Sequence, residues 1–158
     1  MSDLYSRIRH DDSEGIRFGM LFAELYYYMG KNILEAMGDE KGAKIIEKAL
    51  QEFAEMRVRG MKEEAAEKGL TVKTMDDYFQ IRDMPTCGWE NSEERGVCLV
   101  CLFDEVWKKY GASGRKLEAF YCNIDYHLFG SFGFHLERPQ CKAYGDDICR
   151  FILTRKDD

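Results

Sequence analysis

Apolar side chains recur at helical spacing through the first half of the chain. Ser13 is a suitable N-cap, so we expect a helix over residues 14–37, ended by Gly38. A second helix is expected over residues 40–68, closed by Gly69, with Arg57 interrupting its apolar face. Such an arginine either extends to the edge of the face or meets a buried anion. The apolar positions of the first helix are Ile16, Met20, Leu21, Leu25, Tyr28 and Met29.

The second half of the chain alternates short strand and helix patterns. Residues 74–83 are ambiguous between helix and strand, and the apolar run at 97–102 predicts a buried strand. Gly111 and Gly114 are expected to bracket a turn, and residues 144–147 to join two closing strands as a hairpin. The other predicted elements are helices at 103–110 and 117–129 and strands at 134–142 and 148–154.

This order predicts an α+β fold: two long N-terminal helices, then an antiparallel sheet with two shorter helices inserted and a C-terminal β-hairpin. We expect residues 1–158 to form a single domain, with 1–12 as a flexible tail. Because the net charge is −6 and no basic stripe is present, the composition argues against a nucleic-acid partner. No signal peptide or membrane-spanning run is recognisable, so we expect a cytoplasmic protein without a membrane partner.

All six cysteines lie in the second half of the chain, which points to this half for any chemistry. In a reducing compartment, such residues are buried thiols, metal ligands or catalytic groups. Cys101 falls where the predicted strand passes into a helix, a position that can lower the pKa of a thiol. Cys122 and Asp125 are three residues apart on a predicted helix and therefore share a face. A thiol beside a carboxylate could orient water or transfer a proton.

These residues carry a family resemblance. The stretch 101–111, the segment Cys122-Asn123-Ile124-Asp125, and Glu137-Arg138 followed by Gly145 and Cys149-Arg150-Phe151 resemble, in this order, motifs of the L-2-amino-thiazoline-4-carboxylic acid hydrolase family. The resemblance implies a small α+β hydrolase acting on non-peptide C–N bonds. It would add water across the C=N bond of a thiazoline carboxylate and give N-carbamoyl-cysteine. Cys141 and Arg150 depart from the family's usual residues.

The resemblance suggests a Cys/Asp site for a small-molecule substrate. Cys101 or Cys122 would attack the amidine-like carbon or hold a water that does, and Asp125 or Glu105 would act as base and proton donor. Arg138 or Arg57 would bind the substrate carboxylate. The two remaining candidates taken from the motifs are Cys149 for catalysis and Asn123 for substrate binding.

Other interpretations stay open. Cys98 and Cys101 have CxxC spacing, but in a strand they would face opposite sides, so we expect no metal and no cofactor. The C-terminal segment also resembles vinyl-reductase-type (4VR) domains, which would make the protein a non-catalytic module or sensor for a small molecule such as haem. Residues 26–28 and Phe22 could line its pocket or belong to the core. A homo-oligomer is compatible with the sequence.

Overall fold

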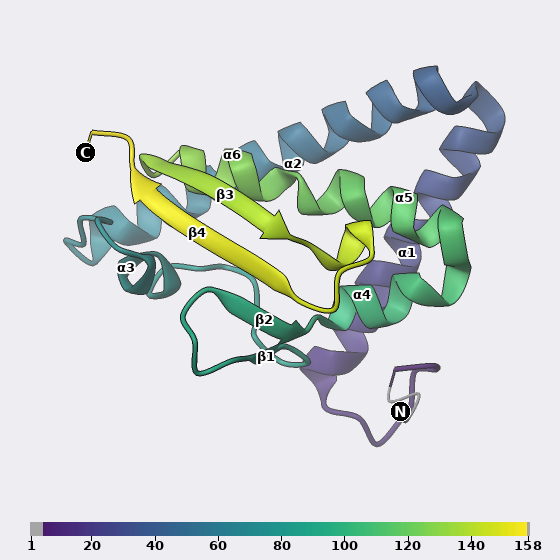
Figure 1. Cartoon of the computed structure of the whole chain (residues 1–158), viewed down its shortest axis with the longest axis horizontal. Coiled ribbons are helices and arrows are strands. Elements are labelled where there is room, and N and C mark those ends of the chain that lie inside the picture. Colours follow the sequence, from purple (N-terminus) through teal and green to yellow (C-terminus); the bar gives the residue numbers. More distant parts are fainter. Residues whose placement is uncertain (1–4, 158) are drawn as a thin grey trace.

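The computed structural model describes residues 5–157 as a mixed helix and sheet protein (Figure 1). Its elements in chain order are α1 (Glu14–Met37), α2 (Asp39–Glu67), α3 (Met75–Phe79), β1 (Glu90–Asn91), β2 (Val97–Val100), α4 (Leu102–Trp107), the 3-10 turn η1 (Lys108–Tyr110), α5 (Gly111–Cys122), α6 (Ile124–Gly130), β3 (Phe134–Gln140), the 3-10 turn η2 (Lys142–Tyr144) and β4 (Cys149–Arg155). The predicted α+β class is confirmed. Within this part of the chain, no helix is both long and apolar enough to cross a bilayer.

The two N-terminal helices form a hairpin whose ends were predicted to within a residue. The Ser13 hydroxyl accepts the Ile16 amide N–H at 3.3 Å, which caps α1. Gly38 ends this helix with a φ of 78°, a conformation that residues with a Cβ rarely adopt. On α2, a Cβ at Gly42 would lie 3.0 Å from the Leu34 backbone, so glycine allows the two helices to approach closely.

The sheet is antiparallel, with strand order β1-β2-β4-β3. Cys98 of β2 is paired with Cys149 of β4, which brings two of the six cysteines together across the sheet. The register of β3 against β4 shifts between Glu137 and Gln140, a stretch that contains Pro139. The two closing strands are joined by η2 and a left-handed Gly145 instead of a tight hairpin turn.

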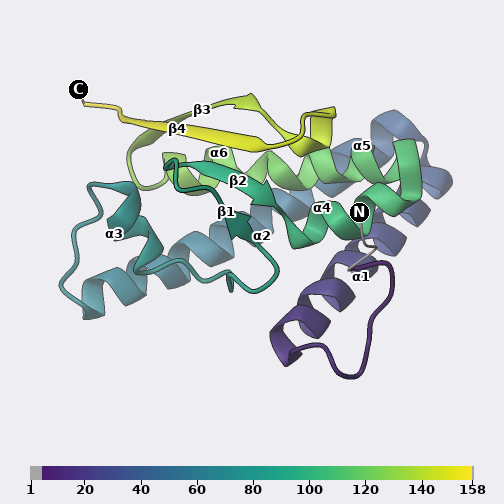
Figure 2. The same ribbon diagram turned by 60° about the horizontal axis from the view of Figure 1, so that its bottom comes forward.

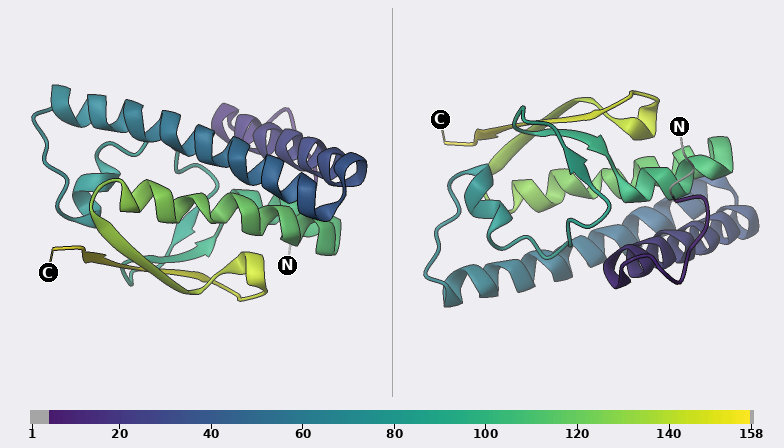
Figure 3. Two further views of the ribbon diagram at one scale, coloured as in Figure 1. Left: turned by 90° about the horizontal axis from the view of Figure 1, so that it is seen from above. Right: turned by 90° about the horizontal axis from the view of Figure 1, so that it is seen from below.

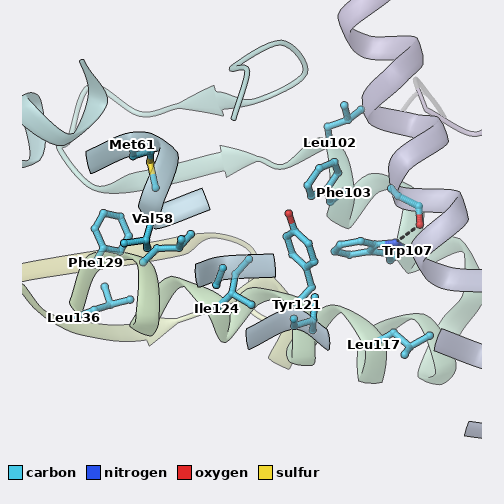
Figure 4. Close-up of a cluster of buried hydrophobic side chains, with 14 of the residues drawn as sticks. Val58, Met61, Leu102, Phe103, Trp107, Leu117, Tyr121, Ile124, Phe129 and Leu136 are labelled. Atoms are coloured by element: carbon cyan, nitrogen blue, oxygen red, sulfur yellow. Dashed lines mark hydrogen bonds between the residues drawn. The ribbon is translucent and has the colours of Figure 1, made fainter. Parts of the chain in front are cut away.

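Three layers are visible in Figures 2 and 3: the sheet, a middle layer of α4, α5 and α6, and an outer layer of α1 and α2. The main core fills the space around the middle helices (Figure 4). There the Trp107 indole N–H donates to the Ala23 carbonyl oxygen at 2.8 Å and ties α4 to α1. Gly19 on α1 lets Leu102 approach, because a Cβ at this glycine would lie 2.5 Å from the leucine Cδ2.

Two sequence predictions were wrong. Gly111 and Gly114 do not bracket a turn, because α5 begins at Gly111 and contains Gly114. A Cβ at Gly114 would lie 1.9 Å from the Trp107 carbonyl oxygen, so this glycine serves close packing of α5 on the end of α4. The single helix expected at 117–129 is divided at Asn123 into α5 and α6. Residues 1–4 of the expected tail lie outside the described part of the chain.

Candidate active site

A cavity of about 290 Å³ lies among the sheet, the middle helices and the segment around α3. Its volume suits a small molecule. Cys98, Cys101, Cys122, Cys141 and Cys149 all line it. Its remaining wall is mostly apolar and aromatic, with Met75, Tyr78, Phe79, Met84, Trp89, Phe103, Trp107, Tyr121, Leu128, Phe129 and Phe151.

Asp125 and Arg138 form the charged centre of the cavity. Asp125 lies in the first turn of α6, and one of its oxygens lies 3.3 Å from Arg138 Nη1. The Arg138 side chain is 1% exposed, and Nη1 also donates to the Cys122 carbonyl oxygen at 2.6 Å. Burial raises the pKa of Asp125 from 3.8 to about 6, and the positive charge of Arg138 limits this rise. Asp125 is therefore largely ionised at neutral pH but close enough to its pKa to exchange a proton.

Three cysteines cluster next to this pair. Hydrogen bonding from Cys122 and Cys149 and the positive charge of Arg138 lower the pKa of Cys141 well below its ordinary value. The same hydrogen bonding and burial raise the pKa of Cys122 and of Cys149. Cys101 lies at the start of α4, and burial raises its pKa to about 12. Within this cluster, ionisation is thus favoured at Cys141 rather than at Cys122 or Cys149.

Two buried polar atoms on the cavity have no hydrogen-bond partner among residues 5–157. One is the Tyr121 hydroxyl, on a residue that is 7% exposed, and the other is Arg138 Nε. Figure 4 shows Tyr121 rising from α5 beside Phe103 and Trp107. Because native proteins pair nearly all buried polar atoms, an unpaired donor on a cavity wall indicates a group that binds a ligand or water.

Four arginines line the cavity, and three of them already have carboxylate partners. Arg57 forms a bidentate ion pair with Asp83, in which Nη2 lies 2.7 Å and Nε lies 2.9 Å from the carboxylate oxygens. Arg95 pairs with Asp76 at 2.6 Å, and Arg138 pairs with Asp125. Arg82 lies over the Phe79 ring, and within the described residues it forms no ion pair. It is therefore the cavity arginine best placed to receive an external anion.

A second charged network holds the loop that carries Cys141. Arg115 donates to Asp104, to a Glu118 oxygen at 2.8 Å and to the Lys142 carbonyl oxygen at 2.9 Å. Burial, followed by the negative charge of Asp104, raises the pKa of Glu118 to about 8. Asp104 and Glu118 are almost fully buried, so this network fixes the backbone next to Cys141 from behind the cavity.

The sequence model of the L-2-amino-thiazoline-4-carboxylic acid hydrolase family matches residues 19–153, which include every cavity residue. The chain belongs to this family. The family name indicates hydrolase-like action on a small thiazoline carboxylate. Searches of curated proteins and of solved structures gave no match.

Most of the site residues predicted from the resemblance to this hydrolase family lie on the one cavity: Cys101, Cys122, Asp125, Cys149, Arg57 and Arg138. Two others lie outside its lining. Glu105 forms an ion pair with Lys108 at 2.6 Å, and Asn123 accepts a hydrogen bond from Arg138 Nη2 at 2.9 Å. Asn123 therefore positions the arginine.

Three cavity residues of this family member were not among the predicted site residues. Tyr121 directly precedes the Cys-Asn-x-Asp motif, but only the folded structure shows its hydroxyl to be unpaired. Cys141 was noted as a departure from the family pattern, and its sequence position gives no sign of contact with Cys122. Arg82 lies in the segment that was ambiguous between helix and strand, and no motif marks it.

The candidate site contains thiols and carboxylates, which are common metal ligands. Even so, among residues 5–157 no three His, Cys, Asp or Glu side chains are arranged to hold a metal ion. The aromatic residues that the sequence suggested as the lining of a ligand pocket, residues 26–28 and Phe22, do not line this cavity. Tyr26 donates to the Leu117 carbonyl oxygen at 2.6 Å, and Phe22 stacks behind Phe103 with ring centroids 5.3 Å apart.

Proposed function

We propose that this protein opens a small cyclic amidine carboxylate of the thiazoline type by hydrolysis, with Asp125 as the base that activates water. One observation carries the proposal. A carboxylate with a pKa raised to about 6 and the unpaired hydroxyl of Tyr121 line the same aromatic cavity. A base with a pKa near neutrality and a free donor on one small cavity are what water addition to a C=N bond requires.

The charges on the cavity wall suggest how the substrate is oriented. The Asp125 carboxylate and Cys141, the thiol of the cluster whose pKa is lowered, lie beside the Arg138 cation, and this arrangement favours a cationic amidinium group at this point. Arg82 is the carboxylate-binding candidate, because Arg57 and Arg138 are already engaged. Trp89 and Phe103, which pack edge-to-face with ring centroids 4.9 Å apart, would form one aromatic wall beside the flat ring.

The reaction then proceeds in two steps. Asp125 takes a proton from water as the water oxygen bonds to the amidinium carbon, and the ring becomes a neutral tetrahedral adduct. The carbon–sulfur bond then breaks as the oxygen forms a C=O bond. Asp125 returns its proton to the departing sulfur, and the hydroxyl proton passes to solvent. Tyr121 would donate a hydrogen bond to the adduct, since burial raises the pKa of this phenol and keeps it protonated.

In this mechanism the nucleophile is water and the cysteines set the charge of the site. Cys101 and Cys122 remain thiols because their pKa values are raised, which makes them poor nucleophiles. Cys141→Ser would therefore slow ring opening but leave measurable turnover, whereas complete loss would indicate covalent attack by this sulfur. Cys122→Ser should retain most of the activity.

The proposal is tested by incubating the purified chain with 2-amino-thiazoline-4-carboxylate and measuring ring opening by mass spectrometry. Asp125→Asn should lower kcat by roughly a hundredfold or more, and Tyr121→Phe by roughly tenfold. Asp11→Asn, an exposed loop carboxylate, is the matched control and should have no effect. Binding of the substrate without turnover would favour a sensor, and undiminished turnover by Asp125→Asn would remove this residue from the chemistry.

A further inference from the structure

Helix α1 is apolar on two opposite faces, although only one of them is covered. Its inner face contributes buried Met20, Ala23 and Tyr27 to the core. The opposite face exposes large apolar side chains at positions 18, 21, 22, 25, 28 and 29, which correspond to the a, d and e positions of a heptad. Phe22 lies at the edge of this face, because its ring also packs on Phe103. We call this set the α1 seam: Phe18, Leu21, Phe22, Leu25, Tyr28 and Met29.

The exposure of the α1 seam is large for a monomer surface. Phe18 is 74% exposed and Leu25 is 62% exposed. With about 200 Å² for each large side chain, the six residues present roughly 650 Å² of apolar surface, slightly more than the largest patch of a typical monomer. Figure 3 shows α1 in the outer layer of helices, on the side away from β3 and β4. A helix with apolar residues on both sides is normally covered on both sides.

We propose that the α1 seam is covered by the α1 seam of a second copy of this chain, in a two-fold symmetric dimer. A two-fold axis sets the same patch of both copies face to face, which suits a continuous apolar stripe. If both seams were fully buried, the dimer would bury roughly 1,300 Å² in total, within the range of specific protein interfaces.

Charge on and around the seam favours this occupant over a membrane surface. Between residues 18 and 30 the only charged residue is Glu24, and it pairs with Lys109 at 2.6 Å within the same chain. A helix that binds anionic lipid carries lysine or arginine along its polar side, and the chain as a whole has a net charge of −6. The two basic residues that flank the stripe in the sequence are Arg17 and Lys31, and Lys31 pairs with Glu35 at 3.2 Å within α1. The uncharged stripe between them is suited to another uncharged stripe.

Leu25 is the position at which to test the dimer. It lies near the middle of the seam, and at 62% exposure its replacement leaves the core intact. Phe22 is less suitable because it stacks on Phe103, which lines the cavity. Ile152→Glu is the matched control, since Ile152 is an exposed apolar residue on β4, far in sequence from the seam.

Sedimentation velocity over about 1 to 100 µM should show a concentration-dependent dimer for the wild type and for Ile152→Glu. Leu25→Glu should raise the dimer dissociation constant by roughly a hundredfold. Leu25→Arg should do the same, and mixing the two variants should restore a dimer, because the axis places the opposite charges close together. This rescue also shows that both variants are folded.

Three outcomes would overturn the proposal. They are a wild type that stays monomeric throughout, a Leu25→Glu variant that dimerises as the wild type does, and a wild-type monomer that binds phosphatidylserine vesicles through the seam. The test does not depend on turnover, so it can fail or succeed independently of the proposed hydrolase activity.

Discussion

Replacing Asp125 by asparagine should lower kcat by roughly a hundredfold or more and at the same time stabilise the protein. Burial raises the pKa of Asp125 from 3.8 to about 6, so its ionised form is less favourable in the folded chain than in the unfolded one. At about 1.4 kcal/mol per pKa unit, ionisation at pH 7 costs the native state about 3 kcal/mol. Asparagine has nearly the same shape and can still accept a hydrogen bond from Arg138, but it carries no charge.

The predicted difference in the free energy of unfolding between the two proteins depends on pH. Because the folded pKa of Asp125 is the higher one, the native state binds more protons between about pH 4 and 6, and stability relative to the asparagine variant falls as the pH rises through this window. The two proteins should have equal free energies of unfolding below about pH 4 and differ by about 3 kcal/mol above about pH 6.

The measurement is urea unfolding followed by circular dichroism at a series of pH values, with Asp11→Asn as the control that should show no such divergence. An Asp125→Asn variant that is less stable than the wild type at pH 7 would refute the reasoning. So would a stability difference that does not change with pH. Either result would mean that the Arg138 ion pair outweighs the burial of the carboxylate.

Three further substitutions test other parts of the structure. Arg82→Gln should raise KM for the thiazoline carboxylate roughly tenfold with little change in kcat, because it removes a charge that binds substrate and transition state equally. Asp83→Asn should cost about 2 kcal/mol in urea unfolding, since it leaves the buried Arg57 guanidinium without its partner, although Asp83 itself is partly exposed. Gly114→Ala should cost more than about 3 kcal/mol by the same measurement, because its Cβ would collide with backbone.

Each of these substitutions has a matched control. Arg95→Gln also removes a cavity arginine, but one that is exposed and paired with Asp76, and should leave KM unchanged. Asp76→Asn breaks that exposed ion pair and should cost less than about 1 kcal/mol. Gly60→Ala, at a helical position where a Cβ meets nothing within 4 Å, should be neutral or stabilising. Equal effects in a variant and its control would contradict the corresponding argument.

The long helices were predictable because their signals are local. The Ser13 cap, the 3.6-residue periodicity and the positive-φ Gly38 are all set by near neighbours in the sequence. Gly114 misled the prediction because a glycine that permits close helix packing looks the same in sequence as one that makes a turn. The choice depends on Trp107 being placed against it by the fold.

In the candidate site, too, contacts between near neighbours in the sequence could be predicted and contacts made only by the fold could not. Cys122 and Asp125 could be paired from the sequence because they are three residues apart, and both line the cavity although the helix is divided between them at Asn123. Cys141 could not be joined to them, because its contact with Cys122 depends on how the connection between β3 and β4 folds back over α5. Glu105 was proposed as an alternative base from the family resemblance, but its carboxylate forms an ion pair with Lys108 one turn later and lies outside the cavity lining.

Arg138 was predicted to bind the substrate carboxylate, whereas its contacts favour a role in setting the pKa of Asp125. Burial alone would carry this pKa higher, and the charge of Arg138 is the largest influence that brings it back to about 6. Arg138→Gln should therefore move the acidic limb of the kcat/KM profile to higher pH and lower the activity at pH 7, with activity recovering as the pH is raised. Arg82→Gln, measured in parallel, should change KM and leave the position of the limb unchanged. A limb that does not move in Arg138→Gln, together with a large rise in KM, would show instead that Arg138 binds the substrate carboxylate.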